Sequence, residues 1–314
     1  MKAALLTGCT GEIGNALVRL LLAQGTKVYA LCRPNSWRLR HLPTALDLQV
    51  IERDIFDLPG AEKDIPAPCD ACFHLGWHAS YGEERNDAYG QVRNITATLD
   101  AVHLAARLGC QVFVGAGSQA QYGDTDEILT EDTPMRPTNA YGAAKLCAEQ
   151  MSRELCAALG PRHVWGRVAS VYGPCDGPYT LISYLMRTQL EGKEALLTPC
   201  EQLWDYLYAD DAARAFLALA QKGRDGHAYC IASGSSRPLR DYIADFRALL
   251  GERARLTIGG KAYAPNHRMR LAVDITKLCE DTDFAPQVGF ADGIARTWRW
   301  YGEQTTPFDT HPNT

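Results

Sequence analysis

The chain has 314 residues, of which 46% are hydrophobic and 22% are charged, as expected for a globular protein that buries a large core. Its formal net charge of −5 argues against general binding to nucleic acid or to membrane surfaces, so an anionic ligand would need a local positive pocket. No run of about 18 apolar residues indicates a membrane span, and no signal region opens the sequence. We therefore expect a cytoplasmic protein without nucleic-acid or membrane partners.

The 11 cysteines are odd in number and scattered along the chain. Cys69 and Cys72 form one Cys-x-x-Cys, but no second pair follows at zinc spacing. We interpret them as plain thiols in a reducing compartment and predict no metal site.

A glycine-rich turn joins a predicted strand at residues 2–6 to a predicted amphipathic helix. Gly8 suits a tight turn with positive φ, Gly11 permits close approach of a pyrophosphate, and Gly14 permits tight helix packing. The helix N-terminus would offer free N–H groups to the phosphates. An ordinary strand–turn–helix connection can carry the same triplet, but a second strand at 27–32 completes a βαβ beginning and favours a dinucleotide site.

Strands and helices alternate through the first half of the chain. We predict further strands at 47–51, 71–75, 111–116 and 163–170, and helices at 94–108 and 140–159. This alternation predicts an α/β fold, a Rossmann doubly wound parallel sheet whose ligands bind outside the carboxyl ends of the strands.

The pattern loosens after Gly173, with helices expected at 181–190 and 210–222 and a short strand at 195–198. We predict that residues 1–172, with 205–232 returning, form the dinucleotide-binding domain. A smaller mixed α/β C-terminal substrate lobe would comprise 173–204 and 233–301, followed by a tail at 302–314.

Tyr141 and Lys145 lie four residues apart on the helix predicted at 140–159, so both side chains share one face. Such a pair often marks only a solvated helix face. Here Ser118 follows the preceding strand, at the sheet edge where the glycine-rich turn would hold a cofactor. The three side chains are therefore candidates for a catalytic site beside a nicotinamide.

Five motifs in order make the chain resemble an extended short-chain dehydrogenase/reductase of the NAD-dependent epimerase/dehydratase family over roughly residues 1–301. They are residues 7–14, 118–123, 141–145, 167–174 and 205–213. The resemblance implies an NAD(P)-dependent enzyme acting on a nucleotide-activated sugar. It also implies that Lys145 binds the nicotinamide ribose, and the family is commonly dimeric through paired helices, here 94–108 and 140–159.

The chemistry expected of this site is acid–base catalysis coupled to hydride transfer. A free tyrosine has a pKa of about 10, too high for a base at neutral pH, and we expect the Lys145 ammonium to lower the pKa of Tyr141. Tyr141 would then exchange a proton with a sugar hydroxyl while hydride moves to or from the same carbon. Ser118 would hydrogen-bond the reacting oxygen.

The cofactor preference depends on the end of the second strand, where no carboxylate is available for a ribose 2′-hydroxyl. Arg33, with Ser36 and Arg38, could pair with a 2′-phosphate, although Arg33 could equally stack on the adenine of NAD. We favour NADP(H) slightly over NAD. The predicted cofactor-binding residues are Gly8, Thr10, Gly11, Glu12, Ile13, Gly14, Arg33, Asp54, Ile55, Leu75, Tyr141 and Lys145.

For the substrate, the resemblance implies a diphosphate held by an arginine just before Asp205, but Trp204 stands there. Arg268 and Arg270 are the expected replacements, and Trp204 would either stack on a base or sugar or fill the interface between lobes. Gln119 is a further candidate substrate contact.

The reaction type stays open between epimerisation and 4-keto reduction. Family dehydratases carry an acidic pair after the catalytic residue, whereas Gln119 and Ala120 stand here and can do no acid–base work. The loop at 173–177 is similar to that of bacterial nucleotide-sugar 4-keto reductases. The alternatives are an NADPH-dependent reductase of a non-nucleotide carbonyl compound and a non-catalytic dinucleotide sensor.

Four further residues are expected near the cofactor or the helix beside it. His74 and His78 are expected in a polar loop beside the nicotinamide ribose. Tyr81 could face the substrate, and Asn94 is either a helix-distorting residue or an ordinary mid-helix polar residue.

Overall fold

A computed structural model describes residues 1–264 and 267–304 of the chain. Part of the predicted tail, residues 305–314, lies outside the described residues. The first lobe is a parallel sheet of seven strands in the order β11-β6-β5-β4-β1-β2-β3. Its strands are β1 (Ala3–Thr7), β2 (Lys27–Cys32), β3 (Leu48–Glu52), β4 (Ala71–His74), β5 (Val112–Ser118), β6 (Arg162–Val168) and β11 (His227–Ile231). The predicted Rossmann fold is confirmed.

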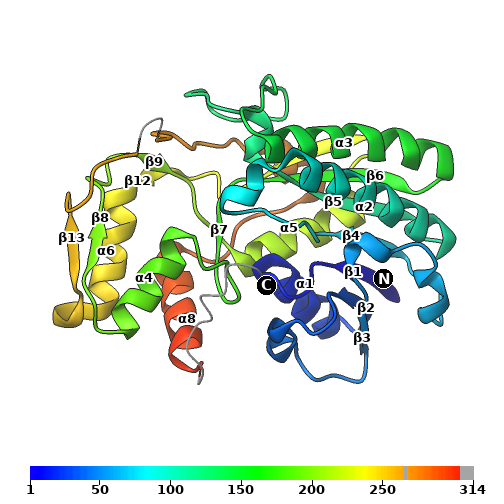
Figure 1. The fold of residues 1–314 in the computed structure, drawn as a ribbon, viewed down its shortest axis with the longest axis horizontal. Helices are drawn as coiled ribbons and strands as arrows, with labels where there is room; N and C mark the ends of the chain where they lie inside the picture. Colours follow the sequence, from blue (N-terminus) through cyan, green and yellow to red (C-terminus); the bar gives the residue numbers. More distant parts are fainter. Residues whose placement is uncertain (265–266, 305–314) are drawn as a thin grey trace.

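Helices cover both faces of this sheet. On one face α1 (Glu12–Ala23) packs beside α5 (Ala209–Lys222), and on the other α2 (Ala88–Arg107) packs beside α3 (Ala140–Leu159). Figure 1 shows α2 and α3 running side by side along the sheet. Strand order reverses between β1 and β4, which opens a crevice at their carboxyl ends where ligands of such folds bind.

The start of one helix and the presence of one strand differ from the sequence prediction. The helix expected at 94–108 begins six residues earlier, at Ala88, because the Asp87 side chain accepts a hydrogen bond from the Tyr89 N–H and caps it. The seventh strand, β11, was missed. Its Tyr229, Cys230 and Ile231 are buried and pair with β6 in a parallel register.

The second lobe has its own hydrophobic core, which includes Leu185, Met186, Tyr242, Phe246 and Ile294. It contains three helices, α4 (Leu181–Leu190), α6 (Leu239–Leu250) and α8 (Phe290–Gly302), and a parallel pair of strands, β8 (Ala195–Leu197) and β13 (Leu256–Ile258). Figure 1 places these elements together at the end of the molecule away from α2 and α3.

Short strands connect the lobes. They are β7 (Val171–Tyr172), β9 (Leu203–Trp204), β10 (Leu207–Tyr208) and β12 (Arg237–Pro238), with β7 paired to β10 and β9 to β12.

Packing differs from the predicted domain division in one segment. Leu271, Val273, Leu278 and Phe284 are buried in the core of the Rossmann lobe, and α7 (Thr276–Thr282) lies against α5 and β11. The chain from residue 271 to 284 therefore packs with the dinucleotide-binding lobe, although its place along the chain is within the range expected for the substrate lobe.

No helix among the described residues is both long enough and apolar enough to cross a bilayer. Within the same part of the chain no group of three or more His, Cys, Asp or Glu side chains is placed to hold a metal ion. Cys69 and Cys72 are buried free thiols.

Candidate active site

A cleft of about 720 Å³ runs along the carboxyl ends of the central strands and continues between the two lobes. The first lobe contributes the turn after β1 and the ends of β2, β4 and β5. The second lobe contributes residues 175–182 and Trp204 and Tyr206. The cleft thus lies at the crevice that the strand order creates.

The glycine-rich turn leaves room for a ligand at the N-terminus of α1. Gly8 has φ of 74°, and a Cβ there would lie 2.6 Å from the Gly76 nitrogen. A Cβ at Gly14 would lie within 3 Å of the Gly8 carbonyl group, whereas one at Gly11 would meet only that oxygen, at 3.6 Å. Gly11 is therefore the open position, facing the cleft where a pyrophosphate would approach.

Ser118, Tyr141 and Lys145 meet at the end of β5. All three line the cleft and are buried. Asn139 caps α3 by accepting a hydrogen bond of 2.8 Å from the Gly142 N–H, which begins the helix at Ala140 and places Tyr141 in its first turn. The Ser118 hydroxyl accepts a hydrogen bond of 3.2 Å from the Ala120 N–H and is close enough to Tyr141 to act on its pKa.

The protonation of Tyr141 differs from the expectation. Burial raises the pKa of Tyr141 above its ordinary value, against the opposing effects of the Ser118 hydrogen bond and the charge of Arg85. Burial also lowers the pKa of Lys145 well below its usual range. These residues by themselves therefore do not lower the pKa of Tyr141, since the cost of desolvating the charged forms is larger than the favourable interactions.

Lys145 is held in place on two sides. Its ammonium donates a hydrogen bond of 2.7 Å to the Ala116 carbonyl oxygen and lies 3.7 Å from the centre of the Trp77 ring. It therefore links α3 to β5 beside the catalytic serine.

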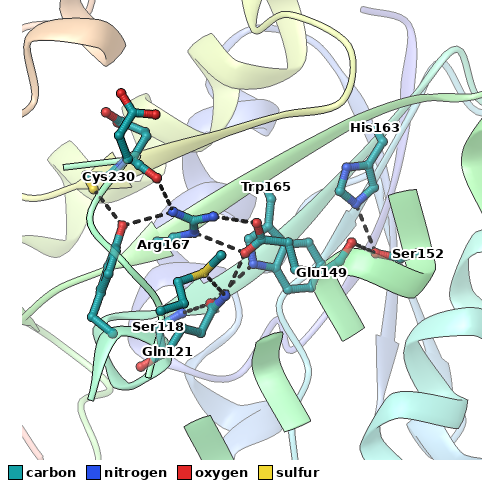
Figure 2. Close-up of polar contacts among 12 residues, drawn as sticks. Ser118, Gln121, Glu149, Ser152, His163, Trp165, Arg167 and Cys230 are labelled. Carbon is teal, nitrogen blue, oxygen red and sulfur yellow. Dashed lines mark hydrogen bonds and ion pairs between the residues drawn. The ribbon is translucent and has the colours of Figure 1, made fainter. Parts of the chain in front are cut away.

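A buried polar network fixes the turn that carries Ser118 (Figure 2). The side-chain oxygen Oε1 of Gln121 accepts a hydrogen bond of 2.9 Å from the Ser118 N–H, and the side-chain Nε2 of Gln121 donates one of 2.6 Å to Glu149. Glu149 also forms an ion pair of 2.6 Å with Arg167, and both side chains are about 95% buried. The network connects α3, β6 and the end of β5, so it positions all three catalytic candidates relative to one another.

The adenosine end of the cleft contains the expected residues. Arg33, Ser36, Asp54, Ile55 and Leu75 all line it. Arg33 is exposed. The Asp54 side chain caps the short helix Ile55–Asp57 by accepting a hydrogen bond from the Phe56 N–H, so its place in the cleft has a structural cause.

Glu12 lines the cleft, as predicted, but it contacts a second carboxyl group that the sequence did not lead us to expect there. Its carboxyl group lies next to that of Asp176 from the second lobe, and burial raises the pKa of both groups, that of Asp176 to about 6. Asp176 accepts hydrogen bonds from the Gly177 N–H and the Thr180 hydroxyl. The contact of two carboxyl groups from distant segments could not be found from either local motif.

The predicted substrate residues divide into two groups. Gln119 and Trp204 line the cleft, and the Trp204 indole N–H donates a hydrogen bond of 3.1 Å to the Ser170 hydroxyl. Arg268 and Arg270 do not line it. Arg268 instead donates hydrogen bonds to the Gln119 side chain and to the Gly123 carbonyl oxygen. Trp204 packs against the cores of both lobes, in agreement with an interface role. It also lines the cleft.

The segment after β4 supplies both a cleft residue that the sequence singled out and one that it did not. Arg85, for which no sequence pattern gave a signal, lies over the Tyr141 ring with its guanidinium carbon 4.5 Å from the ring centre. His78 lines the cleft, whereas His74 is buried between Thr7 and Thr98 and is not part of it. Asn94 is a buried mid-helix residue whose amide bonds both the N–H and the carbonyl of His78.

Comparison with known proteins identifies the family. The model of the NAD dependent epimerase/dehydratase family matches residues 4–232, well over half of the chain.

The chain belongs to this family.

Individual relatives of the family have several activities. A dTDP-glucose 4,6-dehydratase of Streptomyces griseus is 29% identical over 95% of this chain and 93% of that protein. A dTDP-glucose 4,6-dehydratase of Streptomyces venezuelae, solved with NAD and TYD bound, is 26% identical with a TM-score of 0.83, over 96% of this chain and 97% of that one. The UDP-glucose 4-epimerase of Thermotoga maritima, solved with UDP-glucose, shares the fold with a TM-score of 0.85 at 23% identity, over 96% and 99% of the two chains. This epimerase/dehydratase family member is therefore an enzyme of the extended short-chain dehydrogenase/reductase type.

Proposed function

We propose that this enzyme transfers hydride between NAD(P) and a carbon of a nucleotide-activated sugar, as a 4-keto-sugar reductase or an epimerase. The observation that carries the proposal is the convergence of Ser118, Tyr141 and Lys145 at the end of β5, beside the open glycine turn. The family relatives that hold NAD, TYD or UDP-glucose support the classes of cofactor and substrate.

The three catalytic candidates have different roles in this proposal. Tyr141 passes its hydroxyl proton to the carbonyl oxygen that is reduced, or accepts it from the alcohol that is oxidised. Ser118, close enough to Tyr141 to act on its pKa, hydrogen-bonds the same oxygen and fixes its position. Lys145, anchored on Ala116, would bind the cofactor ribose and carries charge toward Tyr141 when it is protonated.

The nicotinamide cofactor, when bound, supplies or accepts the hydride, and its oxidised ring adds a positive charge that favours the tyrosine phenolate. The chain's residues fit this group, because Gly11 leaves the α1 N-terminus open and Tyr141 and Lys145 line the cleft at the end of β5.

A 4,6-dehydratase is less well supported, although the relatives include dehydratases. Gln119 and Ala120 follow Ser118, and the carboxylates that line the cleft are Glu12, Asp54, Glu84 and Asp176 among the described residues. Asp54 caps a short helix, Glu84 pairs with His78, and Glu12 and Asp176 contact each other. None of these follows the catalytic serine where a dehydratase would need its acid and base.

NADP(H) is the proposed cofactor, on the strength of Arg33 and Ser36 at the end of β2. A guanidinium can form paired hydrogen bonds with a 2′-phosphate, and no carboxylate follows this strand to bind a 2′-hydroxyl instead. The preference favours a reductase, which exchanges reduced cofactor at each turnover.

The test is mass spectrometry of the nucleotide that the freshly purified protein releases on denaturation. Retained NAD⁺ would favour an epimerase, which recycles its cofactor within one turnover, whereas retained NADP(H) would favour a reductase. A protein that neither carries nor binds any nicotinamide dinucleotide would contradict the proposal. Competition by free nucleoside diphosphates then separates a sugar enzyme from a reductase of non-nucleotide carbonyl compounds.

A further inference from the structure

The cleft is unevenly charged, and the substrate lobe contributes no cation to it. Among the described residues of that lobe that line the cleft, residues 175–182 with Trp204 and Tyr206, none is lysine or arginine. Arg33 lies with the adenosine-end residues, Arg38 donates a hydrogen bond of 3.2 Å to the Asp176 carbonyl oxygen, and Lys145 is held by Ala116 and Trp77. An anionic substrate therefore needs a cation from elsewhere in the cleft wall.

Arg85 is such a cation. It belongs to the short helix Glu83–Asn86 and lies over the Tyr141 ring, 4.5 Å from its centre. Its Nε atom is enclosed by protein and has no hydrogen-bond partner among the described residues. The neighbouring Glu84 does not neutralise it but pairs with His78 at 3.8 Å. Contact with the face of an aromatic ring uses no N–H donor, so the edge of the guanidinium stays free to bind a ligand.

Arg268 lies near Arg85, but carboxylates already face it. It donates a hydrogen bond to the side chain of the cleft residue Gln119. Burial is the largest cause that lowers the pKa of Arg268, and the charge of Arg85 acts in the same direction, whereas the charges of Asp124 and Asp126 oppose both. Among the described residues, Arg85 is therefore the cation beside Tyr141 that is left for a ligand.

We propose that Arg85 binds an anionic oxygen group of the substrate, a carboxylate or a phosphate, at the Tyr141 end of the cleft. A planar guanidinium with a free edge matches both groups through paired hydrogen bonds. The proposal rests on the proposed function, because it names the substrate chemistry of the same site. The two sources of the anion are a carboxylate on the sugar ring and the diphosphate of the nucleotide.

The experiment compares binding by wild type, Arg85→Gln and Arg85→Lys in the presence of saturating oxidised cofactor. Titration calorimetry would use inorganic pyrophosphate, UDP, UDP-glucose and UDP-glucuronic acid as probes. Arg153→Gln is the matched control, since Arg153 is a partly exposed residue of α3 that pairs with its neighbour Glu154 away from the cleft. Cofactor affinity, measured in parallel, reports whether each variant keeps its fold.

Arg85→Gln should weaken binding of the anion that it holds by ten- to hundredfold, with unchanged cofactor affinity. Arg85→Lys should lie between it and wild type, because lysine keeps the charge but not the planar fork. A loss confined to UDP-glucuronic acid assigns the site to a sugar carboxylate, and an equal loss for UDP and both sugars assigns it to the diphosphate.

Affinities that are the same in Arg85→Gln and wild type for every probe would overturn the anion site. A wild type that binds pyrophosphate through Arg85 but binds neither UDP nor the sugars would leave the anion site intact and contradict the nucleotide-sugar function. The two failures are thus distinguishable.

Discussion

The ammonium of Lys145 donates a hydrogen bond of 2.7 Å to the carbonyl oxygen of Ala116, two residues before Ser118. The helix that carries Tyr141 is therefore fastened to the strand that carries the serine, and this junction holds the geometry on which acid–base catalysis depends.

Replacement of the proton donor should remove activity without removing the cofactor. Tyr141→Phe keeps the ring that packs against Trp77 and Arg85 but lacks the hydroxyl. We expect kcat to fall by about 10²- to 10⁴-fold with cofactor affinity nearly unchanged. Steady-state kinetics with the identified substrate, together with a cofactor titration, measures both. Full activity in Tyr141→Phe would show that the catalytic assignment is wrong.

The buried ion pair of Figure 2 should be sensitive to the loss of one partner. Glu149→Leu leaves the Arg167 guanidinium buried without its carboxylate and should destabilise the protein by about 3–5 kcal/mol. The double variant Glu149→Leu/Arg167→Met should be less destabilised, because no uncompensated charge remains. Urea unfolding checks this order, and equal stability of single variant and wild type would contradict it.

Gln121 provides a milder test of the same network through its link to Ser118. Gln121→Leu removes the acceptor for the Ser118 N–H and the donor to Glu149. We expect kcat to fall about tenfold or more while KM changes little, since the serine loses its fixed position rather than its contact with the substrate. A fall in stability with an unaltered kcat would instead assign Gln121 a purely structural role.

The Glu12–Asp176 contact should make stability depend on pH. Burial raises the pKa of Asp176 from 3.8 to about 6, so the native state binds more protons than the unfolded state between these values. Stability contributed by this group is then complete at low pH and is lost as the pH rises toward 6, a change on the order of 3 kcal/mol.

Asp176→Asn removes this titration and should be more stable than wild type above pH 6, with the difference shrinking toward pH 4. Arg38, whose charge lowers the pKa of Glu12, and the Thr180 hydroxyl, which bonds Asp176, are unchanged in the variant. Denaturant unfolding at pH 5 and pH 8 measures the difference. Lower stability of the variant at pH 8 would show that the charged carboxylate is favourable here.

Cofactor choice can be tested at the exposed Arg33. Arg33→Ala should weaken NADP(H) by about tenfold and leave NAD(H) binding nearly unchanged, because only the 2′-phosphate would lose its partner. Fluorescence titration with both reduced cofactors provides the comparison. An equal effect on both would favour stacking of Arg33 on the adenine.

Local patterns were sufficient to predict six of the seven strands of the first lobe and the helices that cover its sheet. The turn at Gly8, Gly11 and Gly14 and the spacing of Tyr141 and Lys145 each encode a steric or helical requirement within a few residues. The strand His227–Ile231 was missed because its identity as a strand depends on pairing with β6, a contact between distant segments.

Relations between distant segments could not be predicted in the same way. Three contacts depend on how the two lobes and the segment after β4 pack against each other. They are the contact of Glu12 with Asp176, the position of Arg85 over Tyr141, and the hydrogen bond from Arg268 to Gln119. The predicted direction of the Tyr141 pKa shift was wrong, because the sequence shows the neighbouring charge but not how deeply the tyrosine is buried.

The most direct test of the account is to follow the hydride itself. Reduced cofactor carrying deuterium at the transferable position of the nicotinamide is incubated with the enzyme and a 4-keto nucleotide sugar, and the sugar is analysed by mass spectrometry. A reductase and an epimerase both reduce such a ketone, so the account predicts one deuterium on the sugar with wild type and with Arg153→Gln, and transfer that is about 10²- to 10⁴-fold slower with Tyr141→Phe. Deuterium transfer to the sugar at the same rate in Tyr141→Phe, or no transfer by wild type to any nucleotide-linked ketone, would contradict it.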